Sequence, residues 1–284
     1  MKKSIMMMPL LFTAVLGTVF FGRRYALAQS EELAEKQVTV SQHDDETEEN
    51  TAGMAPADGE NISAENNPNE LLTHYETNSA NLSLYEYLDF MSLKNGKVTL
   101  AYYGDIDTEE AWINEVTDRI QDSVSGTVSV IDHSYPGYDS YELYIEQTPQ
   151  AVLDEAPDVI LYALPALPDQ QRDMGLTETE EFMGYVLDRL LTLEDMKLFM
   201  LEPYPVPEQI SQLNSRSLDY RSYLGRMQTV SEAYGVPLIP LHAEFTAKST
   251  EGSLDYYFDE SAELNEAGNQ QVISLLDKLF SEEM

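Results

Sequence analysis

The stretch Val98-Thr99-Leu100-Ala101-Tyr102-Tyr103, followed at once by Gly104-Asp105-Ile106-Asp107-Thr108, decides the fold of this chain. Its first half is an apolar run rich in β-branched and aromatic residues, which is typical of a strand buried on both faces. Its second half leads into a helical pattern with Trp112, Val116 and Ile120 on one side. A buried strand that passes through a glycine into a helix predicts the start of a strand–helix–strand unit.

The same alternation continues towards the end of the chain. Four further apolar stretches have strand character, and helical periodicity separates them. This order predicts an α/β fold, a three-layer α/β/α sandwich with a mostly parallel five-stranded sheet. Ligands bind such sheets beyond the carboxyl ends of the strands, so a site is expected in the loops there. The further strands are expected at residues 128–131, 158–163, 197–201 and 236–241, and the helices at 108–124, 143–155, 180–193, 217–234 and 266–280.

The composition excludes several classes of function. Acidic residues outnumber basic ones by 51 to 16, and the resulting net charge of −35 repels nucleic acid and anionic lipid. Cysteine is absent, which excludes disulfides, thiolate metal sites and a cysteine nucleophile. The tabulated metal-loop spacings do not occur either, and we expect neither a metal nor another cofactor.

The amino terminus has the pattern of an export signal. Lys2 and Lys3 precede an uncharged run over residues 4–22, and Ala26-Leu27-Ala28 offers small residues at the spacing of a signal-peptidase site. Residues 1–28 are therefore predicted to be a signal peptide or, if uncleaved, a membrane anchor. Either form places the protein outside the cytoplasm, secreted or anchored at the cell surface.

The chain between this signal and the sheet has a different character. Residues 29–80 are polar and acidic and show neither a helical nor a strand period, which predicts a disordered spacer. Residues 81–284 are expected to form the folded domain, which opens with a short helix between residues 82 and 91. The membrane is expected to be contacted only through an uncleaved amino terminus.

Three short blocks resemble those of the SGNH/GDSL hydrolase family, in the family's order. Gly104-Asp105-Ile106-Asp107-Thr108 resembles the Gly-Asp-Ser-x-Thr block that opens the family domain. Residues 132–140 resemble the second block, with Gly137 in the slot of the glycine whose amide lines the oxyanion hole. Residues 260–269 match the frame of the last block, Asp-x-x-His before Ala-Gly. The resemblance implies the flavodoxin-like sandwich of that family over residues 97–280.

The residues that give the family its hydrolytic activity are missing from their slots. Ile106 stands in the nucleophile slot, and isoleucine cannot attack a carbonyl. Glu260 and Glu263 stand in the aspartate and histidine slots. The asparagine that donates to the oxyanion is absent near Ala166 and Leu167. The resemblance therefore implies a degenerate member, a pseudoenzyme that keeps the fold without its chemistry.

The leading hypothesis is an exported cell-surface protein of this fold that binds or organises a surface polysaccharide without hydrolysing it. Tyrosine offers a flat apolar face and a hydroxyl, which suits sugar rings, although packing in the core explains the same tyrosines equally well. The pocket residues expected at the strand ends are Asp105, Asp107, Tyr135, Tyr138, Asp169 and Tyr204.

Two other hypotheses remain open. An active carbohydrate esterase or acyltransferase with a rearranged site would use His133 or His242 as its base and Ser134 or Thr108 as its hydroxyl. A cation-dependent binding or scaffold protein would use the carboxylates of the loops, because hard cations such as Ca²⁺ prefer oxygen ligands. The acidic loops are also what any strongly acidic protein would carry.

Overall fold

The computed structural model describes residues 68–79, 81–207, 209–249 and 254–283. The predicted signal peptide or membrane anchor, residues 1–28, and most of the predicted spacer lie outside the described residues. Within the described ranges, no helix combines the length and the apolar character needed to cross a bilayer.

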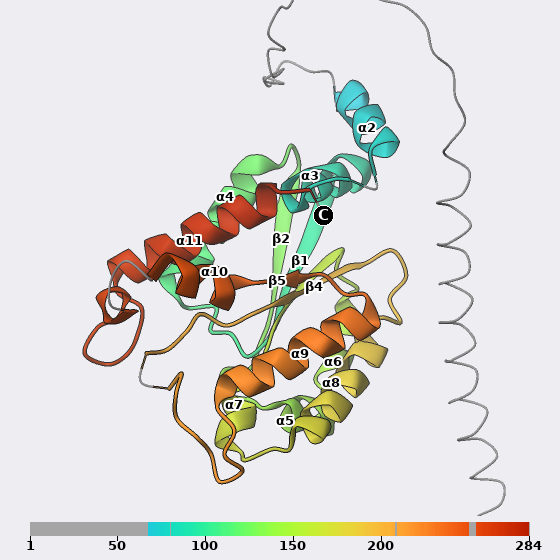
Figure 1. Ribbon diagram of the computed structural model, residues 1–284. Helices are drawn as coiled ribbons and strands as arrows, with labels where there is room; N and C mark the ends of the chain where they lie inside the picture. The colour runs from blue at the N-terminus through green and yellow to red at the C-terminus, as the bar shows by residue number, and fades with distance from the viewer. Residues whose placement is uncertain (1–67, 80, 208, 250–253, 284) are drawn as a thin grey trace, which may run out of the picture. The chain divides into compact units, whose positions relative to one another are not determined.

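Five strands form one sheet, in which every pair of neighbouring strands is parallel. The strand order is β2-β1-β3-β4-β5, which is that of flavodoxin-like folds. Figure 1 shows the sheet between two layers of helices. This order confirms the predicted sandwich. The strands are β1 (Lys97–Gly104), β2 (Thr127–Ser134), β3 (Val159–Ala163), β4 (Lys197–Leu201) and β5 (Leu238–Ile239).

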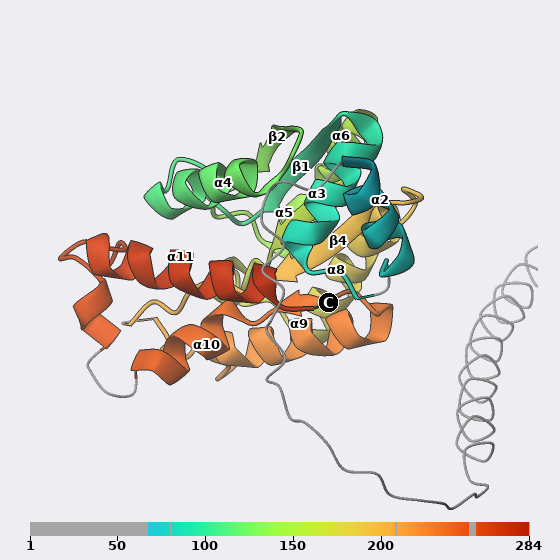
Figure 2. The ribbon, with the colours of Figure 1, turned by 90° about the horizontal axis from the view of Figure 1, so that it is seen from above.

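Helices cover both faces of the sheet, as Figure 2 shows from above. One face carries α3 (Leu84–Asn95), α4 (Ala111–Ser123), α10 (Leu241–Lys248) and α11 (Glu266–Ser281). The other carries α5 (Ser140–Ile145), α6 (Pro149–Glu155), α7 (Ala166–Gln171), α8 (Leu176–Leu190) and α9 (Tyr220–Tyr234). Two cores result, one on each side of the sheet.

Successive side chains of β1 point alternately into the two cores. Leu100 and Tyr102 belong to the core under α3, α4 and α11, whereas Ala101 and Tyr103 belong to the core under α8 and α9. All four side chains are at most 1% exposed. Fully burying one leucine contributes about 1.5–3 kcal/mol, so a strand buried on both faces is a large part of the stability.

The folded part begins earlier than predicted, which corrects the boundary of the spacer. Helix α2 (Pro68–Thr77) lies within residues 29–80. Its Tyr75 is buried among apolar side chains, and the hydroxyl donates to Asp89 Oδ2 at 2.9 Å. Tyr75 and the partly buried Leu71 dock this helix on the core, and two apolar side chains are too few to give a period in the sequence.

Several element boundaries also differ from the prediction. Strand β2 runs to Ser134, so Asp132 and His133 lie in the sheet and not in a loop. The predicted helix at 143–155 is two short helices, interrupted near Gln147, where φ is +55°. Strand β5 is only two residues long because the flanking prolines have no N–H to donate to a ladder. Helices α7 and α10 were not predicted at all.

The cavity described below lies where the direction of the chain reverses. From β1 the chain crosses to β2 through α4 on one face, and it returns to β3 through α5 and α6 on the other. The loops after β1 and β3 therefore diverge, and a crevice opens at the carboxyl ends of these strands. Gly104 sits at this point with φ of +95°, and an added Cβ would clash with the carbonyl oxygen of Ala163.

Replacing Gly104 with alanine is expected to destabilise the protein by about 2–4 kcal/mol, because left-handed strain adds to the clash. Gly96 is the matched control, since its φ is +78° but a Cβ there would meet nothing within 4 Å. The Gly96→Ala variant is expected to lose only about 1–2 kcal/mol. Urea unfolding measures both losses, and equal losses would contradict the assigned close approach.

Candidate functional site

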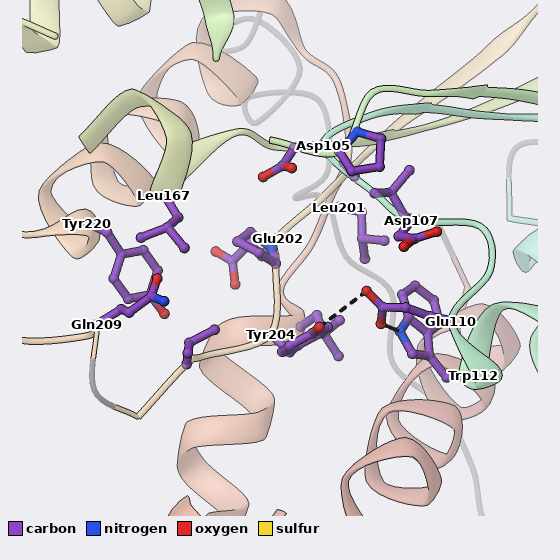
Figure 3. Close-up of a pocket in the computed structure, with 16 residues that line it drawn as sticks. Asp105, Asp107, Glu110, Trp112, Leu167, Leu201, Glu202, Tyr204, Gln209 and Tyr220 are labelled. Atoms are coloured by element: carbon purple, nitrogen blue, oxygen red, sulfur yellow. Dashed lines mark hydrogen bonds between the residues drawn. The ribbon is translucent and has the colours of Figure 1, made fainter. Parts of the chain in front are cut away.

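A cavity of about 180 Å³ opens at the carboxyl ends of β1, β3 and β4. Its wall is formed by the loop after β1, the start of α4, and the loop after β4 (Figure 3). Apolar side chains supply most of the surface, and several carboxylates point into the space. The site therefore combines a partly dry environment with acidic groups.

Asp105 is the acidic group nearest the chain reversal. Its backbone N–H donates to Ala163 O at 3.2 Å, which extends the sheet by one residue and fixes the side chain beside the cavity. Its Oδ1 accepts the Gly137 amide at 2.8 Å. Burial raises the pKa of Asp105 to about 6, and the Gly137 amide opposes the shift. The amide in the oxyanion slot is thus already occupied by a carboxylate of the chain.

Apolar side chains occupy the nucleophile slot and the asparagine slot of the family site. Ile106 is buried, lines the cavity, and donates its backbone N–H to Gly104 O at 2.9 Å. Leu167 lines the cavity from α7, near where the family places its asparagine. Neither side chain can attack a carbonyl or donate a hydrogen bond.

Glu110 forms the opposite side of the cavity together with two aromatic residues. Tyr204 donates its hydroxyl to Glu110 Oε1 at 3.2 Å, and Trp112 Nε1 donates to Glu110 Oε2 (Figure 3). Burial raises the pKa of Glu110, although both hydrogen bonds oppose the shift. Burial and the nearby Glu110 carboxylate raise the pKa of Tyr204 well above its ordinary value. The phenol consequently stays protonated and acts as a donor.

Glu202 follows β4 directly and is 1% exposed, yet its carboxylate has no cation partner among the described residues. It accepts Gln228 Nε2 at 2.8 Å and the Ala243 backbone N–H at 3.2 Å. The second donor belongs to the first turn of α10, whose dipole favours an anion. The sequence pattern did not single out Glu202, although its place directly after a buried strand is a signal for such a residue.

The two histidines of the rearranged-site hypothesis lie apart from the candidate hydroxyls. His133 is in β2 beside Tyr103, and its Nε2 is 3.2 Å from Glu155 Oε1. His242 Nδ1 is 2.6 Å from the Tyr220 hydroxyl, and burial lowers the pKa of His242 to about 4. In the part of the chain that the structure describes, no hydrogen bond joins either imidazole to a serine or threonine hydroxyl.

The candidate hydroxyls converge on a carboxylate instead. Thr108 Oγ1 donates to Asp132 Oδ2 at 2.7 Å. The Ser134 backbone N–H donates to Asp132 Oδ1 at 2.9 Å. These bonds lower the pKa of Asp132, although its partial burial works in the other direction. The arrangement holds the end of β2 against the loop before α4, and it brings no imidazole to a hydroxyl.

The remaining predicted pocket residues divide between the cavity and its surroundings. Asp107 and Tyr204 line the cavity, and Asp107 is exposed at its rim. Tyr135 and Tyr138 lie outside the lining, with ring centroids 5.3 Å apart. Asp169 is also outside, because α7 turns it into the core on the α8 side of the sheet.

Asp169 holds three elements together. Its Oδ1 accepts the Ser140 N–H at 2.7 Å, and its Oδ2 accepts the hydroxyls of Ser140 and Thr179 at 2.9 and 2.8 Å. Complete burial raises its pKa to about 7, against the effect of these donors. Asp169 thus links α5, α7 and α8 through buried hydrogen bonds.

Glu260 and Glu263, which occupy the aspartate and histidine slots, are both exposed. Glu263 borders a shallow hollow next to the cavity, together with Glu110 and Tyr204. Glu260 lines neither space. Among the described residues, no group of three or more carboxylates or imidazoles is placed to hold a metal ion.

The raised pKa of Asp105 can be tested through the pH dependence of the free energy of unfolding. Because its folded-state pKa of about 6 lies above the ordinary 3.8, ionisation disfavours the folded state as pH rises between these values. Asparagine keeps an acceptor for Gly137 but does not ionise. The free energy of unfolding of the Asp105→Asn variant, measured relative to that of the unchanged protein, should therefore rise by roughly 2–3 kcal/mol between about pH 4 and about pH 7.

The matched control for this comparison is Asp107→Asn, since Asp107 is exposed at the same cavity. Urea unfolding across the pH range measures the difference for each variant. A stability difference that is independent of pH for Asp105→Asn would contradict the raised pKa.

Comparisons with known proteins complete the description of the site. No protein-family model matches the chain, and no curated protein matches it in sequence. Solved structures do match in fold. The acetyl xylan esterase AlAXEase is 19% identical with a TM-score of 0.50, over 64% of this chain and 98% of the esterase.

Two further structures are similar in the same way. A lipase/acylhydrolase from Enterococcus faecalis is 15% identical with a TM-score of 0.51, over 66% of this chain and 97% of its own. A variant of Axe2, an acetyl-xylooligosaccharide esterase from Geobacillus, is 11% identical with a TM-score of 0.54, over 64% of this chain and 94% of its own. The described domain therefore has the SGNH/GDSL hydrolase-like fold.

Proposed function

We propose that the protein is an exported cell-surface protein that binds a surface glycan in this cavity and does not hydrolyse it. The observation that carries the proposal is the replacement of the hydrolytic slots by Ile106, Leu167 and a carboxylate bonded to the Gly137 amide. The cavity lining lacks the serine, the imidazole and the free oxyanion amide of the family's hydrolytic site, and binding is the function that remains. Export is supported by the signal pattern of residues 1–28.

The chemistry of the wall favours a sugar as the ligand. Trp112, Tyr204 and Tyr220 give apolar ring surface, and the carboxylates give acceptors for hydroxyl groups. The volume of about 180 Å³ is smaller than the ~300–1,000 Å³ usual for pockets that enclose a drug-sized ligand. The cavity would therefore enclose one unit of a chain that continues outside. Two of the similar structures are, by name, esterases of acetylated xylan or xylo-oligosaccharide.

Acetylated xylo-oligosaccharides test whether the protein hydrolyses acetyl esters. Incubated with the full chain, they should release no acetate above the buffer rate, because the described cavity lining contains no serine or threonine hydroxyl. The Ile106→Ser variant should also release none, since Glu263 is not an imidazole and lies outside the cavity lining. Enzyme-coupled acetate detection measures both. Release that a single loop substitution abolishes would contradict the proposal.

Binding is tested through the hydroxyl of Tyr204. The Tyr204→Phe variant keeps the ring but loses the donor to Glu110, so affinity for an oligosaccharide that binds the cavity should fall about three- to tenfold. Calorimetry measures the affinity. Tyr256→Phe is the control, because Tyr256 is 67% exposed and lies outside the cavity lining. Equal effects of the two variants, or none from either, would remove the cavity as the site.

A further inference from the structure

The carboxylates of the cavity have an unusual set of partners. Asp105, Glu110 and Glu202 accept hydrogen bonds only from neutral donors, namely backbone amides, a glutamine amide, an indole and a phenol. Asp107 adds a fourth carboxylate at the rim. Within the described ranges, the lining contains no lysine, arginine or histidine. The cavity therefore carries negative charge that no side chain balances.

Acids outside the cavity are stabilised in two ways: two have arginine partners, whereas the fully buried Asp169 has three neutral donors. Asp139 is 3% exposed, and Arg172 Nη1 donates to its Oδ2 at 2.5 Å. The Asp219 side chain, 15% exposed, pairs with Arg221 at 2.6 Å. Both acids also cap helices. Unlike Asp169, which is enclosed in the core, the carboxylates of the cavity lie together beside an open space. Because charge without a counter-charge is costly there, a cation that enters this space would stabilise them.

The raised pKa values of Asp105 and Glu110 are consistent with this deficit. A cation inside the cavity would favour their ionised forms and reverse the shift. The carboxylates come from two loops, Asp105 and Glu110 from the loop after β1 and Glu202 from the loop after β4, and they face the space from different sides (Figure 3). Such spacing suits an organic cation whose donors point in several directions.

An ammonium group has the matching chemistry. It carries three donors on a compact charge, and aromatic rings attract it through their faces. Trp112, Tyr204 and Tyr220 supply such rings in the lining. An anionic sugar would instead meet like charge, and a neutral one would leave the carboxylates unbalanced.

We propose that the sugar unit bound in the cavity carries a free amino group, so that the ligand is a polysaccharide with cationic amino-sugar units. This inference rests on the proposed binding of a glycan at the same cavity. It assigns Asp105, Glu110 and Glu202 as the residues that select the amine over its N-acetylated form, in which the positive charge is lost.

The test compares three oligosaccharides of equal length by calorimetry with the full chain near neutral pH. They are a glucosamine tetramer, an N-acetylglucosamine tetramer and xylotetraose. The glucosamine tetramer is expected to bind at least about tenfold more tightly than either other, and the ratio should shrink as salt is raised. The ratio should also fall below about pH 6, because protonation of Asp105 removes the charge that attracts the amine.

Variants assign the preference to the cavity. Asp105→Asn and Glu110→Gln should each reduce the preference for the amine by about fivefold or more, since each removes one charge from the lining. Asp188→Asn, an exposed acid on α8 outside the lining, removes the same overall charge and should leave the preference unchanged. An amine preference that survives both cavity variants would overturn the assignment to this cavity.

The remaining outcomes separate the inference from the proposed function. Equal or tighter binding of the N-acetylated or xylose tetramer would overturn the inference and leave glycan binding intact. Binding of none of the three would contradict the proposed function and the inference together. A preference reproduced by the Asp188→Asn variant but lost in the two cavity variants would support the inference.

Discussion

The hydrogen bond from the Gly137 amide to the Asp105 carboxylate, 2.8 Å long, is the interaction on which the site depends. It joins the loop after β1 to the loop after β2 and so sets the mouth of the cavity. It also commits the Gly137 amide to a partner within the chain. A developing oxyanion would have to compete with a carboxylate of the same sign, which is the reverse of what acyl transfer requires.

The apolar walls of the cavity change the acidity of its carboxylates. Ile106 and Leu167 exclude water from one side, and the low polarity raises the pKa of Asp105 and Glu110. Among the described residues of the cavity lining, no lysine, arginine or histidine balances the charge of these groups. A cavity built in this way is suited to hold a ligand that brings the missing charge or donors.

Much of the fold could be predicted because local pattern and global structure agree there. The apolar runs of β1 and β4 are buried on both faces, and the period of the last helix matches α11. Gly104 and Gly268 stood out in the family blocks, and in both places an added Cβ would clash with a backbone carbonyl. Close backbone approach is a constraint that a sequence displays directly.

The site was harder to predict because it depends on where strands end. His133 was expected in a loop, but β2 extends through it and points it towards Glu155. Asp169 was expected at the mouth, but the short helix α7 turns it into the core. Glu202 was overlooked, because one carboxylate after a strand looks like the many others in this acidic chain. Which acids are buried is decided by packing and not by composition.

The proposal is that the Asp105 carboxylate has no counter-charge in the free protein and gains one when a cationic ligand binds. A titration of the Asp105 side-chain ¹³C resonance by NMR tests this proposal most directly. Asp105→Asn assigns the signal. The account predicts a midpoint of about 6 in the free protein, which moves down towards the ordinary value of about 3.9 when a glucosamine tetramer is bound. A midpoint already near the ordinary value in the free protein, or one that the bound tetramer leaves unmoved, would contradict it.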